Sequence, residues 1–147
     1  MVTFFKKPYF SKSEESDIVF AIREAEQKTS GEIRVHLVKK CKADTLEEAR
    51  KVFTRLGMHR TKLHNAVLIL VCLESRCFAI FGDSGIHAKA GEDFWHATRD
   101  TMVSYFKHGR VKEGIVAGVK NTGEALKRYF PAQDGQSNEL SDEVSHS

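Results

Sequence analysis

The sequence lacks an apolar run long enough to cross a membrane. Its longest such run, Ala66–Leu73, has the length of a strand, whereas a spanning helix needs about 20 apolar residues. The N-terminal residues also lack the apolar segment of a secretory signal, since lysines directly follow Phe4 and Phe5. We therefore expect a cytoplasmic chain with no membrane span.

Cysteine is scarce, with three residues in 147. Cys41, Cys72 and Cys77 form no Cys-x-x-Cys pair, which argues against a structural zinc site. In a reducing compartment all three are expected to be buried thiols. The alternative is a disulfide between Cys72 and Cys77, which would face each other across a hairpin.

Several functional motifs are missing as well. The sequence has no Walker loop, no Gly-x-Gly-x-x-Gly, no His-Glu-x-x-His and no nucleophile elbow. The net charge of +3 combines +7 in residues 1–130 with −4 in residues 131–147. A body this basic could attract anions or nucleic acid, but it is interpreted as an ordinary mixed surface, and the expected helices near the C-terminus carry no aromatic–basic interleaving. We therefore expect no nucleic-acid partner. Residues 1–130 fit one domain and a monomer, and the acidic segment 131–147 is expected to be a disordered tail.

The apolar periodicity of the remaining sequence predicts alternating helices and strands. Residues 1–10 are interpreted as a lead-in strand or arm. Strands are expected at 32–39, 66–73 and 77–81, and helices at 11–28, 44–57, 92–107 and 112–129. This order is typical of the α/β class. It predicts a three-layer αβα sandwich with a mixed central sheet of about four strands.

The predicted topology gathers polar side chains at one edge of the sheet. Hairpin pairing places Asn65 opposite Asp83, and a parallel first strand brings Glu32 to the same edge. The residues expected there are Glu32, His64, Asn65, Asp83, His87, Glu92 and Asp93. All of these except His87 are predicted metal ligands. Because most offer oxygen, the expected cofactor is a divalent cation, Ca²⁺ or Mg²⁺.

Each of these residues also has a purely structural interpretation. Asp83 beside Gly82 is a common turn residue, and Glu92 and Asp93 are favoured at a helix N-terminus for its dipole. Glu32 could simply begin a strand, and Asn65 could form an Asx turn. The metal-site hypothesis depends on their convergence.

The sequence resembles the TPM domain family, also called the TPM phosphatase family. The resemblance covers about Phe10 to Pro131. The segments that carry it are 29–35, 65–70 and 80–86, followed by Phe94-Trp95, 105–107 and 113–115. It implies an αβα sandwich and a divalent-cation site at the loops by the sheet edge.

The functions of this family vary. Some thylakoid members are linked to photosystem repair and weak acid phosphatase activity, and another is an accessory protein of an acetylcholine receptor. Many relatives are exported and carry a membrane helix, and the family often has Asp-Asn-Gly where this chain has His64-Asn65-Ala66. The missing Asp favours cation binding over catalysis.

Three functions are therefore compared. The first is a non-enzymatic, metal-responsive or interaction module that binds Ca²⁺ or Mg²⁺ at the sheet edge. The second is a weak metal-dependent acid phosphatase with Asp83 as ligand or nucleophile. The third is a protein-interaction module without metal, whose acidic tail recruits an unknown protein partner.

Overall fold

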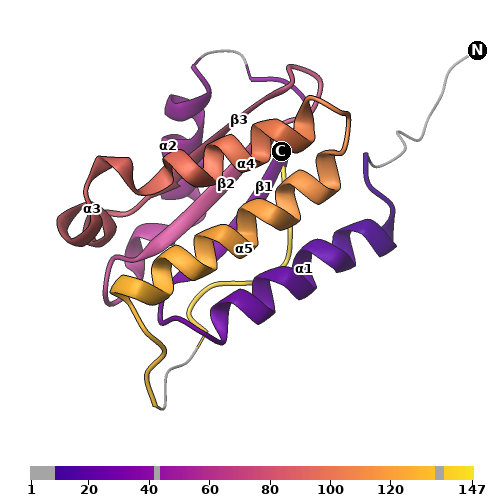
Figure 1. Ribbon diagram of the computed structural model, residues 1–147. Coiled ribbons are helices and arrows are strands. Elements are labelled where there is room, and N and C mark those ends of the chain that lie inside the picture. The colour runs from indigo at the N-terminus through magenta and orange to yellow at the C-terminus, as the bar shows by residue number, and fades with distance from the viewer. Residues whose placement is uncertain (1–8, 42–43, 135–137) are drawn as a thin grey trace, which may run out of the picture.

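A computed structural model describes residues 9–41, 44–134 and 138–147. Figure 1 shows helices packed around a central sheet. The α-helices are α1 (Lys12–Glu26), α2 (Thr45–Arg55), α3 (Ser84–Ala90), α4 (His96–Phe106) and α5 (Val111–Tyr129). The strands are β1 (Glu32–Val38), β2 (Ala66–Cys72), β3 (Cys77–Gly82) and β4 (Ser145–His146). Two 3₁₀ turns, η1 (Met58–Arg60) and η2 (Glu92–Trp95), complete the described elements.

The sheet is mixed, with the strand order β3-β2-β1-β4. β1 pairs with β2 in parallel, so that Glu32 lies beside Ala66, and β2 pairs with β3 antiparallel, so that Val67 lies beside Gly82. The starts of β1 and β2 and the end of β3 therefore share one edge, as predicted. β2 is buried along its whole length, which suits a central strand covered on both faces.

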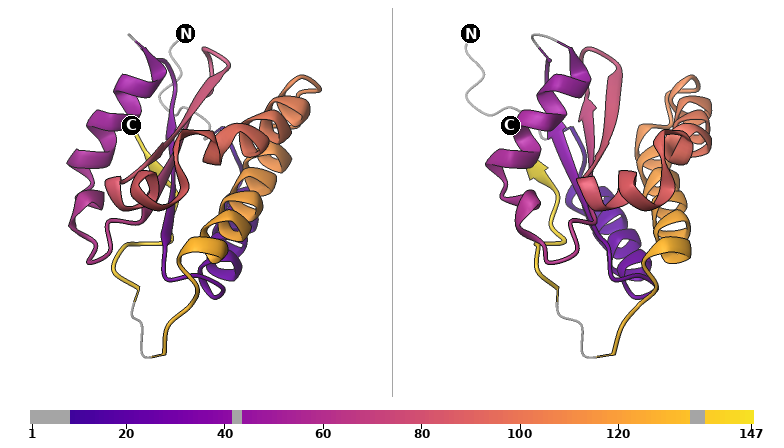
Figure 2. Two further views of the ribbon diagram at one scale, coloured as in Figure 1. Left: turned by 60° about the vertical axis from the view of Figure 1, so that its left-hand side comes forward. Right: turned by 90° about the vertical axis from the view of Figure 1, so that its left-hand side faces the viewer.

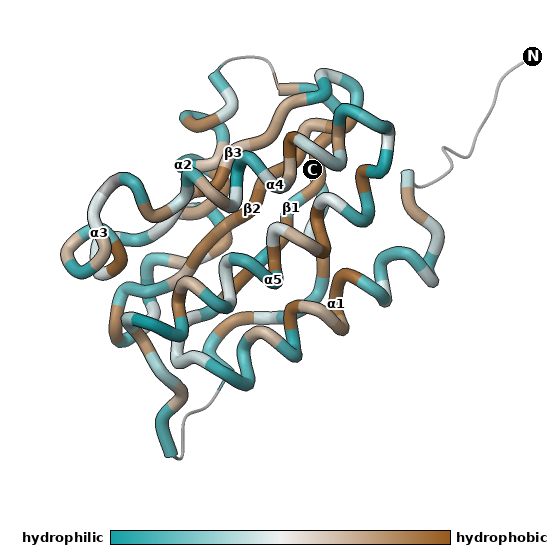
Figure 3. The backbone as a smooth tube through the Cα atoms, in the orientation of Figure 1, coloured by the Kyte–Doolittle hydropathy of each residue, from teal (hydrophilic) through white to brown (hydrophobic). Residues whose placement is uncertain are grey.

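Helices cover both faces of the sheet (Figure 2). On one face, Ile33, Val35 and Leu37 of β1 pack in a core with α1, α4 and α5. On the other face, Leu68 and Leu70 of β2 pack with α2. In Figure 3 the central strands are mainly hydrophobic, whereas hydrophobic and hydrophilic residues alternate along the helices. The three-layer sandwich expected from the sequence is confirmed.

Two predicted helix boundaries need correction. The segment after Asp83, expected to be a glycine-rich loop, folds as α3, and the predicted helix 92–107 is divided into η2 and α4. The sequence did not predict α3 because Gly85 lies within it, and glycine weakens a helix by about 1 kcal/mol. Here a Cβ at Gly85 would lie 2.4 Å from the carbonyl oxygen of Leu63. The close approach of two backbones therefore requires glycine.

The C-terminal segment also differs from the disordered tail that was expected. Residues 138–147 return along the sheet, and β4 pairs in parallel with His36 and Leu37 of β1 (Figure 1). The amide of Ser147 donates to the carbonyl of Leu37 at 2.9 Å. The fourth strand thus comes from this tail. The lead-in strand or arm expected at 1–10 lies outside the described residues except for Tyr9 and Phe10.

The cysteines differ both from the three buried thiols that were expected and from the alternative Cys72–Cys77 disulfide. Cys72 and Cys77 do lie opposite each other in the hairpin, but the disulfide joins Cys72 to Cys41, and Cys77 is a free thiol. Parallel pairing of β1 with β2 brings Val38 beside Cys72, and Cys41 follows shortly after Val38; the sequence-based expectation did not include the Cys41–Cys72 pair. Over the described ranges, none of the helices has the length and apolarity required to cross a bilayer.

Candidate functional site

Asp83 and His64 meet where the loop before β2 touches the start of α3. One Asp83 oxygen accepts the backbone N–H of Ser84 at 2.8 Å. The other lies 3.3 Å from Nδ1 of His64. The Asp83 side chain is 13% exposed and that of His64 is 55% exposed. Asp83 therefore caps α3 and keeps one carboxylate oxygen close to a solvent-facing imidazole.

Asn65 connects this pair to the loop before β1. It is only 1% exposed, and its side-chain amide donates to the hydroxyl of Ser30 at 3.4 Å. A Cβ at Gly31 would lie 3.1 Å from the carbonyl oxygen of Asn65. The loops before β1 and β2 are therefore in direct contact along the edge, in agreement with the predicted convergence.

Glu32 lies farther along the same edge and is 4% exposed. Its Oε1 accepts the backbone N–H of Leu140 at 2.6 Å. Its Oε2 has no hydrogen-bond partner among the described residues. A buried carboxylate oxygen without a partner is costly, so this atom needs a proton or a cation nearby.

Glu32 lines a cavity of about 340 Å³ between α1, the loop before β1 and the returning tail. We call this cavity the edge pocket. Its other lining residues are Arg23, Glu26, Gln27, Thr29, Ser30, Gly31, Asn138 and Asp142. The pocket therefore gathers three acidic side chains, two amide side chains, two hydroxyls and a glycine backbone, most of which offer oxygen ligands.

Burial and crowding of negative charge change the acidity of these carboxyl groups. Burial, with a hydrogen bond to Asp142, raises the pKa of Glu26 to about 9. The Glu26 carboxylate also accepts the backbone N–H of Ile33 at 2.9 Å. Burial likewise raises the pKa of Glu32, although hydrogen bonds from the backbones of Leu140 and Glu139 oppose the shift. The pocket thus holds a proton at neutral pH.

A cation already compensates part of this charge. Nε of Arg23 lies 3.6 Å from Asp142, and its guanidinium also reaches Glu143 at 3.7 Å. Because the Arg23 side chain is 60% exposed, this ion pair is weak and screened by solvent. Arg23 therefore can turn away at little cost if another cation enters the pocket.

The remaining predicted ligands lie elsewhere. The Asp93 side chain is 93% exposed and lies 3.7 Å from Nδ1 of His96, and His87 is exposed on α3. The side chain of Glu92 lies outside the described residues. Across the parts of the chain that the structure describes, no acidic or histidine side chains at this edge bring three ligand atoms within 4.8 Å of one another.

Sequence reasoning missed Glu26 and Asp142. Glu26 lies at the last position of α1, where a charged residue ordinarily faces solvent. Asp142 lies in the segment expected to be disordered. Only the return of the tail to β1 brings these carboxyl groups together, and no local sequence pattern predicts that return.

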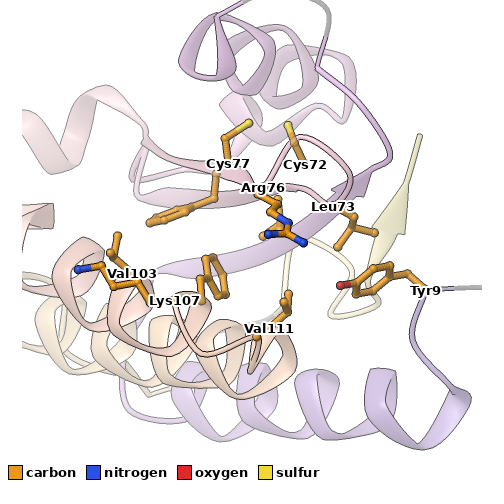
Figure 4. Close-up of a pocket in the computed structure, with 12 residues that line it drawn as sticks. Tyr9, Cys72, Leu73, Arg76, Cys77, Val103, Lys107 and Val111 are labelled. Carbon is orange, nitrogen blue, oxygen red and sulfur yellow. The ribbon is translucent and has the colours of Figure 1, made fainter.

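A second cavity, of about 450 Å³, lies at the opposite end of the sheet and contains no predicted site residue (Figure 4). Phe78, Phe106 and Val111 form part of an apolar wall, and Arg76 and Lys107 supply positive charge. It offers no carboxylate, and it therefore does not contribute to the candidate cation site.

Comparisons with known proteins agree with this architecture. The family model described as "TPM domain" matches residues 6–125. The NMR structure of the BA42 protein from the psychrophilic bacterium Bizionia argentinensis is 43% identical, with a TM-score of 0.91 over 96% of this chain and 97% of that one. No curated protein sequence matches the chain.

More distant structures share the fold alone. The N-terminal domain of a protein from P. gingivalis is 19% identical, with a TM-score of 0.69 over 82% of this chain and 78% of that one. The N-terminal domain of the cg2496 protein from Corynebacterium glutamicum is 14% identical, with a TM-score of 0.64 over 96% and 95%. The arrangement of sheet and helices is thus retained at low sequence identity.

Proposed function

Since this chain belongs to the TPM domain family, we propose that it is a non-enzymatic module that binds a divalent cation, Ca²⁺ or Mg²⁺, in the edge pocket. The observation that carries the proposal is Glu32. Its Oε2 is buried and lacks a partner among the described residues, and the residue itself lines a cavity rich in oxygen ligands. A cation would supply the missing partner.

The chemistry of the pocket fits a hard cation. Ca²⁺ takes six to eight oxygen ligands from carboxylates, amide side chains and backbone carbonyls. Glu26, Glu32 and Asp142 offer carboxylates, and Asn138 offers an amide oxygen. The ligand atoms of the three carboxylates do not all lie within 4.8 Å of one another. Small movements of the tail and of backbone carbonyls would therefore be needed to complete the coordination. Metal binding would therefore order the tail against β1.

Cation binding should release a proton. Glu26 is protonated at neutral pH because its pKa is raised to about 9, and a bound cation favours the ionised carboxylate. The affinity should consequently rise as the pH increases from about 6 toward 9, by up to about tenfold per pH unit for one released proton. The observed binding heat should depend on the ionisation enthalpy of the buffer.

Calorimetric titration with CaCl₂ and MgCl₂ tests the proposal, and amide NMR shifts locate the ion. Glu32→Gln keeps the size of the side chain and removes its charge, so its Ca²⁺ affinity should fall at least about tenfold, or about 1.4 kcal/mol. Asp93→Asn makes the same change of charge at an exposed site and should bind as the wild type does.

Two results would contradict the proposal. One is the absence of both heat and amide shifts at millimolar Ca²⁺ and Mg²⁺. The other is binding that Glu32→Gln leaves unchanged, with shifts confined to His64 and Asp83. The second result would indicate that the cation binds at the N-terminus of α3 instead, and Asp83→Asn would then lower the cation affinity.

A further inference from the structure

All three cysteines of the chain lie together at the hairpin end of the sheet, opposite the edge pocket. Cys41 follows β1, Cys72 ends β2 and Cys77 begins β3. Their sulfur atoms all lie within 4.8 Å of one another. Three separate segments therefore bring the side chains of all three cysteines to one place.

The topology fixes two of these side chains on the same face of the sheet. Cys72 and Cys77 are paired across the hairpin, and both pack in the core on the α2 side. Figure 4 shows both sulfurs pointing to the same side, away from Arg76 and Lys107. The hydroxyl of Thr45, the first residue of α2, donates to Sγ of Cys77 at 3.2 Å. This bond orients the free thiol toward the cluster.

We propose that the reduced chain binds one soft d¹⁰ metal ion, Zn²⁺ or Cu⁺, through the sulfurs of Cys41, Cys72 and Cys77. Thiolates select such ions. Zn–S bonds of about 2.3 Å in a tetrahedron place sulfurs about 3.8 Å apart, which is within the spread of this cluster. Cys72 is buried, whereas Cys41 and Cys77 are half-buried. The fourth position of a tetrahedral ion would therefore face solvent and hold a water molecule.

The Cys41–Cys72 disulfide makes this site dependent on redox state. A small dithiol reductant gives two electrons and two protons to the disulfide, which becomes two thiols, and is itself oxidised to a cyclic disulfide. Each thiol that then binds the metal loses its proton. The disulfide and the metal use the same sulfurs, so the oxidised chain cannot bind the ion in this way.

Cobalt substitution tests the site directly. The full-length chain is reduced without oxygen, its three thiols are counted, and Co²⁺ is added. We expect sulfur-to-cobalt charge-transfer absorption that saturates at one ion per chain and disappears when Zn²⁺ is added. The oxidised chain should show no such absorption. Three free thiols without charge-transfer absorption at stoichiometric Co²⁺ would overturn the proposal.

Variants distinguish three-sulfur binding from adventitious binding. Cys77→Ser removes one ligand at a half-buried position, and Zn²⁺ affinity, measured by chelator competition, should fall at least about a hundredfold, beyond the usual effect of losing an outer-shell partner. Cys41→Ser lies outside the strands and should lower the Zn²⁺ affinity by a similar factor. It replaces Cys77→Ser as the test if that variant does not fold. Unchanged affinity in a folded variant of either kind would overturn the proposal.

Asp83→Asn, at the other end of the sheet, is the control and should leave the cobalt spectrum unchanged. It carries the same sulfur atoms and the same hairpin as the wild type. A cobalt spectrum altered by Asp83→Asn would contradict a site built from the three cysteines. Because the Ca²⁺ titration with Glu32→Gln addresses a different end of the molecule, the two proposals can fail independently.

Discussion

Glu26→Gln is expected to make the protein more stable at alkaline pH, although it removes a charged residue. The folded-state pKa of Glu26 is raised from 4.5 to about 9 by burial and the hydrogen bond to Asp142. The folded chain therefore retains a proton that the unfolded chain loses. The resulting stability is fully present below about pH 4.5 and is lost as the pH rises toward 9. Glutamine imitates the protonated acid without this loss.

The magnitude follows from proton linkage. Three pH units, from 5 to 8, correspond to at most about 4 kcal/mol for one proton. Because Glu26 is only half-buried, solvent screening reduces the expected difference to about 1–2 kcal/mol. For a chain of this size the variant should melt about 2–8 °C above the wild type at pH 8. At pH 5 the two proteins should melt together.

Thermal and urea unfolding at pH 5 and pH 8, with chelator present, measure this difference. Burial is the main cause that lowers the pKa of His36 to about 4. Its contribution to the stability of the folded protein is therefore lost as the pH falls from 6.5 toward 4, in the wild type and the variant alike. Glu24→Gln, at an exposed position of the same helix, is the matched control. If the difference in unfolding free energy between the wild type and Glu26→Gln stayed constant between pH 5 and 8, the reasoning would be refuted.

Three further predictions follow from the structure. Asp83→Ala should lower the free energy of unfolding by about 1 kcal/mol, because the α3 cap is lost; urea unfolding checks this, and an unchanged midpoint would contradict it. Deletion of 138–147 should raise the pKa of His36 from about 4 toward 6.5, because the tail shields this imidazole from solvent. NMR titration of the imidazole measures the pKa, and an unchanged value would contradict the prediction. An aryl phosphate assay should give no metal-dependent turnover, and turnover abolished by Asp83→Ala would favour the phosphatase alternative.

Most of the fold could be predicted because its signals are local. The capping box of α1 is present, with Ser11 and Glu14 bonded to each other's backbone at 3.1 Å. Asp44 caps α2 through two backbone N–H groups. The alternating residues of β1 and the apolar run of β2 each specify a strand. These features depend only on neighbouring residues, so a single sequence contains them.

The site was predictable only in part, because its decisive contacts join distant segments. Strand register correctly placed Asn65 and Asp83 near one edge. It could not reveal that Glu32 would receive the amide of Leu140, 108 residues later. The composition of 131–147 is polar and acidic, which ordinarily indicates disorder. Here β4 pairing and the bond between Glu32 and the Leu140 amide oppose the entropy of the tail.

The same strands that bury the core also separate two kinds of donor atom. β2 begins beside the oxygen-rich edge and ends at Cys72, and its seven residues span about 20 Å. Hard cations prefer the carboxylates at one end, and soft ions prefer the sulfurs at the other. In the two proposals, the proton on Glu26 would control the first group, and the Cys41–Cys72 disulfide would control the second. Because a fully buried strand separates the two groups and they share no ligand, pH would affect the first proposed site and redox state the second.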